Sequence, residues 1–121
     1  MNIDIWVILA IALAGGIGSV IRVLMGRWEG KLPYGILLAN TLASAAGAWV
    51  LIDIGAGEFS SLALIGGFAG GLSTFSAYVG QTVGYWRRGR LLQGILNTAL
   101  QFGLPAGAVY VVALMTGALI N

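Results

Sequence analysis

Hydrophobic residues follow one another in four long runs, at about residues 5–25, 34–54, 62–85 and 91–120. A helix needs about 20 predominantly apolar residues to cross the hydrocarbon core of a bilayer, and each run is long enough. The connections "GRWEGKLP", "GAGEFSS" and "WRRGR" are short. The pattern therefore predicts an all-α integral membrane protein, in which residues 1–121 form a single domain of four transmembrane helices.

Composition supports a membrane protein and excludes several function classes. Hydrophobic residues make up 59% of the chain and charged residues only 8%, against about 25% charged in soluble domains. The N-terminal run lacks a basic segment and carries Asp4, so we expect a retained helix rather than a signal peptide. The absence of cysteine and histidine excludes disulfides and removes the commonest transition-metal ligands. We expect a lipid bilayer as the surroundings and no nucleic acid as a partner, because six basic residues are too few for that.

Charge is distributed unevenly between the two sides of the predicted membrane. The basic residues all belong to the side of the first and third connections: Arg22, Arg27, Lys31, Arg87, Arg88 and Arg90. Asp4, Asp53 and Glu58 belong to the other side, which has no lysine or arginine. Since positive loops stay in the cytoplasm, we predict a multi-pass protein of the cell (plasma) membrane with both termini outside.

Small residues recur in the first three predicted helices, around residues 15–18, 43–47 and 66–71. In lipid such residues let helix backbones approach closely. Four short helices offer little interior of their own, so these faces suggest an oligomer, most simply a dimer. The alternative is that the glycines only pack the four helices of one chain.

Two predicted helices carry unusual polar groups at membrane depth, where such groups are expensive. The Asn40 amide can donate two hydrogen bonds, which suits an anion, but taken alone it favours bonding to a neighbouring backbone. In the third helix "GGLSTF" weakens the helix near its middle. The carbonyls freed by a break there suit a hard cation such as sodium; a simple glycine-mediated crossing is the alternative.

Side chains that share a helix face suggest further contacts. Phe75 and Tyr78 are three residues apart, and their partly positive ring edges can contact a small anion, although plain packing is the more common use. Asn97 and Gln101 share a face of the fourth helix, where they either bond across a helix interface or line a polar track. Pro105 frees a carbonyl and is expected to bend this helix.

No catalytic constellation is present, so we expect a protein that is not an enzyme. Ser73, Thr74 and Ser76 have no histidine or nearby lysine to activate them. The main rival is a small multidrug-resistance-type proton-coupled transporter. Such a transporter needs a carboxylate embedded in the membrane, whereas Asp53 stands at a helix end.

The segments "GSVIRVLMG", "PYGILLANTLAS" and "GGLSTFS" occur in this order in the first, second and third predicted helices. In this combination the chain resembles the Fluc (CrcB) family of fluoride channels over nearly its whole length. The resemblance implies a channel that passively exports fluoride from the cytoplasm and so lowers fluoride toxicity. It also implies an antiparallel dimer of four-helix subunits, with a broken third helix and two fluoride pathways along the interface.

The resemblance also implies a site for a structural, untransported Na⁺ at the dimer centre. Its ligands are backbone carbonyls that match Gly70 and Ser73, where Ser73 replaces the usual threonine. The conserved arginine of the family falls on Arg22, with an electrostatic or structural role at the cytoplasmic end.

The fluoride pathway implied by the resemblance uses neutral donors and ring edges. A phenol at Tyr78 departs from the second phenylalanine of the family and adds a hydroxyl that can donate to fluoride or obstruct it. Gln81 stands where relatives often have an acid, and hydroxyls at Ser44 and Thr74 add further donors. The pathway residues are then Asn40, Phe75, Ser76, Tyr78, Asn97 and Gln101, of which the last two match most loosely.

The charge distribution bears on how such a dimer forms. An antiparallel homodimer requires one sequence to insert both ways, a dual topology that calls for balanced charge on the two sides. The strong imbalance predicts one fixed orientation and a pairing with a homologous chain of opposite bias. The homodimer is the alternative.

Overall fold

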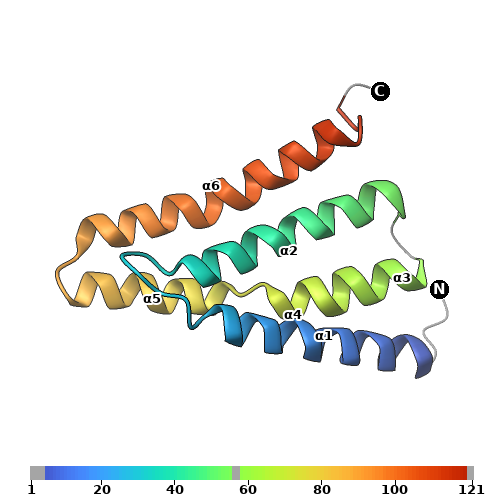
Figure 1. Ribbon diagram of the computed structural model, residues 1–121, viewed down its shortest axis with the longest axis horizontal. Coiled ribbons are helices and arrows are strands. Elements are labelled where there is room, and N and C mark those ends of the chain that lie inside the picture. The colour runs from blue at the N-terminus through green and yellow to red at the C-terminus, as the bar shows by residue number, and fades with distance from the viewer. Residues whose placement is uncertain (1–4, 56–57, 120–121) are drawn as a thin grey trace.

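The computed structural model describes residues 5–55 and 58–119, and within these ranges it is helical with no strand. Among these residues, four helical segments are long and apolar enough to cross a membrane (Figure 1). They are α1 (Ile5–Met25), α2 (Tyr34–Asp53), the composite segment Phe59–Arg87 and α6 (Leu91–Met115). The predicted all-helical class with four transmembrane segments is confirmed.

The composite third segment is broken near its middle, as the "GGLSTF" motif predicts. Its parts are α3 (Phe59–Ser61), the π-helix η1 (Leu62–Ala69), α4 (Gly70–Leu72) and α5 (Phe75–Arg87). Between α4 and α5, Ser73 and Thr74 are extended, with φ/ψ of −79°/151° and −154°/122°. The helix therefore stops for two residues and starts again.

Some boundaries differ from the predicted runs. The third segment begins at Phe59 rather than 62 and continues to Arg87 instead of 85, while α2 ends one residue early, at Asp53. The largest correction concerns α6, which ends at Met115 rather than 120. Gly117 takes a left-handed φ of 75°, and this turns the chain out of the helix. Asp4 and Ile120 lie outside the described residues.

Glycine lets α1 and the third segment cross with their backbones in contact. A Cβ added to Gly18 would overlap the Phe68 carbonyl, and one added to Gly71 would overlap the Gly15 carbonyl. These two helices pack along each other through η1 and α4, whereas α6 packs against α2 and α5. Packing within one chain therefore explains Gly18 and Gly71.

Other glycines are not explained by packing within the chain. A Cβ at Gly16, Gly47 or Gly66 would meet no atom within 4 Å among the described residues. The buried core is correspondingly small and consists mainly of Ala39, Ala43, Ala69 and Leu72. Most side chains of the bundle thus face outward.

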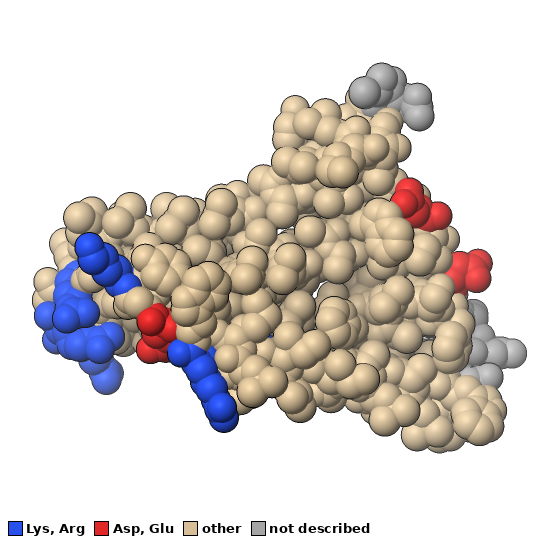
Figure 2. Space-filling model, viewed as in Figure 1, with Lys and Arg blue, Asp and Glu red and all other residues tan. Residues whose placement is uncertain are grey.

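The fold brings the basic connections to one end of the bundle and the acidic connection to the other, as the distribution of charge over the connections predicts. The α1–α2 and α5–α6 connections lie at one end of the bundle, and the α2–α3 connection lies at the other (Figure 1). Lysine and arginine gather at the first end, where the α1–α2 connection also carries Glu29, and acidic side chains lie at the second end (Figure 2), where Asp53 ends α2 and Glu58 precedes α3. The Lys31 carbonyl links the α1–α2 connection to the adjoining turns of α5 and α6, because it accepts hydrogen bonds from the Tyr85 hydroxyl (3.3 Å) and Gln93 Nε2 (3.4 Å). The orientation of the bundle in a bilayer stays a prediction.

Candidate functional site

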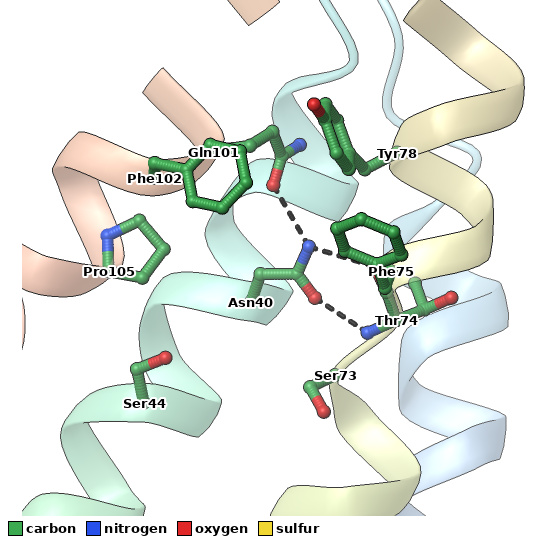
Figure 3. Close-up of a pocket in the computed structure, with 9 residues that line it drawn as sticks. All are labelled: Asn40, Ser44, Ser73, Thr74, Phe75, Tyr78, Gln101, Phe102 and Pro105. Atoms are coloured by element: carbon green, nitrogen blue, oxygen red, sulfur yellow. Dashed lines mark hydrogen bonds between the residues drawn. The ribbon is translucent and has the colours of Figure 1, made fainter. Parts of the chain in front are cut away.

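The break in the third segment is bridged by a side chain of α2. Asn40 Oδ1 accepts a hydrogen bond of 2.7 Å from the Thr74 backbone N–H, and Asn40 Nδ2 donates one of 3.1 Å to the Thr74 carbonyl (Figure 3). In a continuous helix both backbone groups would bond to residues one turn away. Asn40 therefore supplies hydrogen bonds to the backbone at the point where the helix is interrupted.

The break also separates carbonyls on its N-terminal side from their ordinary helical partners. The Thr74 N–H, which would donate to Gly70, donates to Asn40 instead. The Ala77 N–H, which would donate to Ser73, donates to Thr74 Oγ1 over 3.3 Å, because Thr74 is the N-cap of α5. Gly70 and Ser73, the two residues implied as Na⁺ ligands, are thus among the residues next to the break whose carbonyls lose a helical N–H partner, and both residues are exposed.

A cavity of about 220 Å³ lies beside the break. Its walls come from α2, the break itself, α5 and α6, and all nine lining residues are uncharged (Figure 3). They are Asn40, Ser44, Ser73, Thr74, Phe75, Tyr78, Gln101, Phe102 and Pro105. The cavity combines amides, hydroxyls and aromatic rings without a full charge.

Three aromatic rings follow one another along the cavity. Phe75 and Tyr78 pack edge to face at 5.3 Å between centroids, and Tyr78 and Phe102 do so at 5.8 Å. Phe75 is 67% exposed, so much of its ring is open to whatever lies next to this face. Phe102 is a cavity residue that the sequence analysis missed; no sequence period links it to the other two rings, although it follows Gln101 directly.

The Tyr78 hydroxyl is bonded within the chain. It donates to Thr98 Oγ1 over 3.3 Å, and Thr98 in turn donates to the Gly94 carbonyl over 3.0 Å. In Figure 3 this hydroxyl lies on the side of the ring away from Asn40. Tyr78 therefore presents mainly its ring to the cavity, as a phenylalanine would.

The two amides of α6 have different surroundings. Gln101 lines the cavity and accepts a hydrogen bond of 2.9 Å from Asn40 Nδ2 through its Oε1. Asn97 is fully buried and donates to Thr82 Oγ1 over 3.0 Å, in the contact between α5 and α6. Both amides thus bond across a helix interface, Asn97 to α5 and Gln101 to α2, and of the two only Gln101 also lines the cavity.

Pro105 lies in α6 one turn after Gln101, and the helix continues through it. Because proline has no N–H, the Gln101 main-chain carbonyl loses its usual partner. The proline thus leaves a residue that lines this cavity, Gln101, with a main-chain carbonyl that has no helical N–H partner.

Ser76 and Arg22 belong to a second cavity, of about 510 Å³, near the basic end of the bundle. Thr74 lines both cavities, and its hydroxyl lies 3.3 Å from that of Ser76. Arg27 adds a second positive charge to this wall. Gln81 lines neither cavity; its Oε1 is buried and has no hydrogen-bond partner among the described residues.

Comparison with known proteins places the chain in a family. Residues 9–117 match the model of the family described as CrcB-like protein, Camphor Resistance (CrcB). The chain belongs to the CrcB family. This membership confirms the resemblance carried by the three motifs, and the match extends over most of the CrcB chain described above.

Relatives of this CrcB chain include proteins named fluoride-specific ion channel FluC. One from Rhizobium etli is 32% identical over 112 residues, which cover 84% of this chain and 89% of the relative. One from Legionella pneumophila (strain Lens) is 37% identical over 92 residues, covering 64% and 69% respectively. A third, from Sulfurihydrogenibium sp., is 31% identical over 105 residues, covering 79% and 85%.

Proposed function

We propose that the chain is a subunit of a fluoride-selective channel that passively exports F⁻ from the cytoplasm and so lowers fluoride toxicity. Its relatives in the CrcB family are named fluoride-specific ion channels. The observation that carries the proposal is the uncharged cavity beside the helix break, which offers amide donors, hydroxyls and aromatic edges at membrane depth. The same family relation supports the expectation that the protein is not an enzyme.

The cavity has the chemistry that fluoride needs. Fluoride is small and strongly hydrated, so a selective path must replace its water with hydrogen-bond donors at each step. Amide N–H groups, the hydroxyls of Ser44 and Thr74, and the edges of the aromatic rings can do this in succession. Since none of these groups carries a full charge, none holds the ion too tightly for it to leave.

The second cavity is a suitable cytoplasmic entrance. Arg22 and Arg27 raise the positive potential there, which attracts anions, and the neighbouring Ser76 and Thr74 hydroxyls lead toward the first cavity. Export needs no coupled energy source. HF formed in acid surroundings crosses membranes and ionises in the cytoplasm, so the trapped fluoride leaves down its electrochemical gradient.

A structural Na⁺ is part of the proposal. The described residues contain no group of three His, Cys, Asp or Glu side chains that could hold a metal. The carbonyls of Gly70 and Ser73 are instead neutral oxygen donors, which suit a hard cation. When bound, the ion would add positive potential near the anion path, while Gly70 and Ser73 would hold it from the break.

The working unit in this proposal is an antiparallel dimer, favoured with a homologous chain of opposite charge bias and otherwise a homodimer. Broken backbone is tolerated at membrane depth only where protein or a water-filled cavity covers it. Gly70 and Ser73 are exposed in the isolated chain, and so is most of Phe75. A second subunit on this face would cover the break and complete the cavity wall.

The proton-coupled transporter has less support. All residues that line the first cavity are uncharged, so no carboxylate is placed there to exchange protons with a cationic substrate. Asp53 is the last residue of α2 and is exposed.

The test is an efflux assay with the purified chain in fluoride-loaded vesicles, read with a fluoride electrode. We expect release of fluoride much faster than of chloride from the assembly that conducts, and loss of release in Asn40→Asp, which adds a negative charge beside the cavity. Vesicles that release fluoride and chloride equally would contradict the proposal.

The same vesicles test the subunit pairing. We expect this chain to conduct when it is joined by a homologue with positive charge on the opposite side. Strong release from the chain alone, inserted equally in both orientations, would instead establish the homodimer.

A further inference from the structure

We propose that Gln101 presents the amide N–H that fluoride meets in the first cavity, and that Asn40 is a positioning residue that orients Gln101. This inference rests on the proposed fluoride channel. The two side chains form one connected path of hydrogen bonds, from the Thr74 backbone through Asn40 to Gln101 (Figure 3). The hydrogen bonds that each amide already makes decide which N–H group is left for an anion.

Both N–H groups of the Asn40 amide have acceptors within the chain. Nδ2 donates to the Thr74 carbonyl over 3.1 Å and to Gln101 Oε1 over 2.9 Å. A carboxamide has only two such hydrogens. Asn40 could donate to an anion only by giving up a bond that holds the helix break or the one that holds Gln101.

The orientation of the Asn40 amide follows from its backbone partners. A backbone N–H can only donate and a carbonyl can only accept, so Oδ1 must face the Thr74 N–H and Nδ2 must face its carbonyl. The remaining Nδ2 hydrogen requires an acceptor, which makes the nearer atom of the Gln101 amide its oxygen. The Gln101 Nε2 group is therefore turned away from Asn40.

Gln101 Nε2 is a buried donor. Gln101 is only 8% exposed, and within residues 5–55 and 58–119 its Nε2 has no hydrogen-bond partner. A buried donor without an acceptor is unfavourable, so this position suits a ligand that accepts hydrogen bonds. Asn97 allows no equivalent conclusion, because its Thr82 hydroxyl partner can donate or accept and does not set the orientation of the amide.

The position of Gln101 fits the passage of a small anion. Its Nε2 is drawn on the Tyr78 side of the cavity in Figure 3, close to the series of aromatic rings. Because Asn40 donates to Oε1, it polarises the Gln101 amide and strengthens the Nε2–H groups as donors. The helix break thus determines the direction and the strength of the donor through Asn40.

Gln101→Met separates this arrangement from one in which Asn40 binds fluoride directly. The substitution removes the Nε2 donor without adding charge, and it also frees one Asn40 N–H from its acceptor. If Asn40 were the direct ligand, efflux would be kept or increased. We expect efflux to fall about tenfold to a hundredfold, the usual effect of losing one hydrogen bond to a charged group.

The matched control is Gln93→Met, the same substitution in the same helix at a glutamine that bonds to the Lys31 carbonyl outside both cavities. We expect its efflux to equal that of the parent. Gln101→His, which keeps one ring nitrogen to accept and one N–H to donate, should retain more efflux than Gln101→Met. Efflux from Gln101→Met equal to or above the parent would overturn the inference.

A measurement on the unmodified chain covers the case in which Gln101→Met does not fold. The sequence has three glutamines, so side-chain ¹⁵N labelling of glutamine yields three NH₂ signals, to be followed by NMR as fluoride is added. We expect the Gln101 signal to shift with fluoride and not with chloride, while the Gln93 signal stays in place. A parallel experiment with ¹⁵N-asparagine in which only Asn40 responds would overturn the inference.

These experiments separate the two proposals. A parent chain that conducts fluoride, with equally active Gln101 variants, overturns only the role of Gln101. A parent chain that releases no fluoride in any pairing overturns the channel function.

Discussion

Tyr78 presents its ring to the first cavity and uses its hydroxyl for a contact elsewhere in the chain. Its ring lies between Phe75 and Phe102 in edge-to-face contacts, and its hydroxyl is bonded to Thr98 on α6. The sequence raised two possibilities for the hydroxyl, donation to fluoride or obstruction. The geometry favours a third use, in which the hydroxyl holds the ring in place.

Tyr78→Phe should therefore leave fluoride efflux unchanged. We expect a loss of about 0.5–1.5 kcal/mol in the free energy of unfolding, because one hydrogen bond disappears. Tyr110→Phe is the control, since the Tyr110 ring is exposed on the outer face of α6. A large rise or fall in efflux for Tyr78→Phe alone would show that the hydroxyl faces the ion path.

At the level of elements, the third segment is held by different means along its length. Its first half packs on α1 through glycines, with backbone against backbone. Its break is held by Asn40, and α5 is capped by Thr74. Hydrogen bonds from Asn40 of α2 and the Thr74 cap of α5 therefore stabilise the interruption.

Gly71→Ala should destabilise the protein, because the new methyl group would overlap the Gly15 carbonyl and force α1 away. Overpacking of this kind typically costs about 1–3 kcal/mol. Thermal unfolding in detergent measures the effect, with Gly16→Ala as the matched control, since a Cβ there meets no described atom within 4 Å. Equal unfolding temperatures for the two variants would contradict the packing described for this crossing.

At the level of the whole molecule, the separation of charge gives the bundle a basic end and an acidic end (Figure 2). The basic end contains the α1–α2 and α5–α6 connections, and the Lys31 carbonyl of the first is hydrogen-bonded to α5 and α6 next to the second. Positive loops of membrane proteins remain in the cytoplasm. This distribution should therefore fix the orientation of every copy.

Single cysteines can test that orientation, because the chain has no cysteine of its own. Ser60→Cys and Leu91→Cys mark exposed positions at opposite ends of the bundle, and neither changes a charge. In intact cells, we expect a membrane-impermeant thiol reagent to label Ser60→Cys and to label Leu91→Cys only after permeabilisation. Substantial labelling of both variants in intact cells would indicate dual topology and contradict the fixed orientation.

Features that depend on local composition could be predicted. The four apolar runs determine the transmembrane segments, and "GGLSTF" locates the break because glycine and hydroxyl residues weaken any helix at that point. The end of α6 was predicted too late, since apolar residues continue past Met115 while the left-handed Gly117 turns the backbone. A run of apolar residues does not indicate where the backbone leaves the helix.

The division of roles among the polar side chains could not be predicted. Asn97 and Gln101 share a helix face, yet one is buried against α5 and the other lines a cavity. Phe102 has no regular spacing from Phe75 and Tyr78 and joins them only because α6 packs beside α5. Sequence spacing describes one helix at a time, whereas these roles depend on which helices are neighbours.

The sequence by itself determined the membrane-spanning segments, the sidedness of charge, the weak point in the third segment and the resemblance to a channel family. Each of these depends on neighbouring residues or on the order of motifs along the chain. Only the tertiary structure decided what the Asn40 amide does, because its partners lie 34 and 61 residues away at Thr74 and Gln101. A hydrogen bond requires two atoms at about 3 Å in a suitable direction, and only the packing of α2 between the break and α6 provides that.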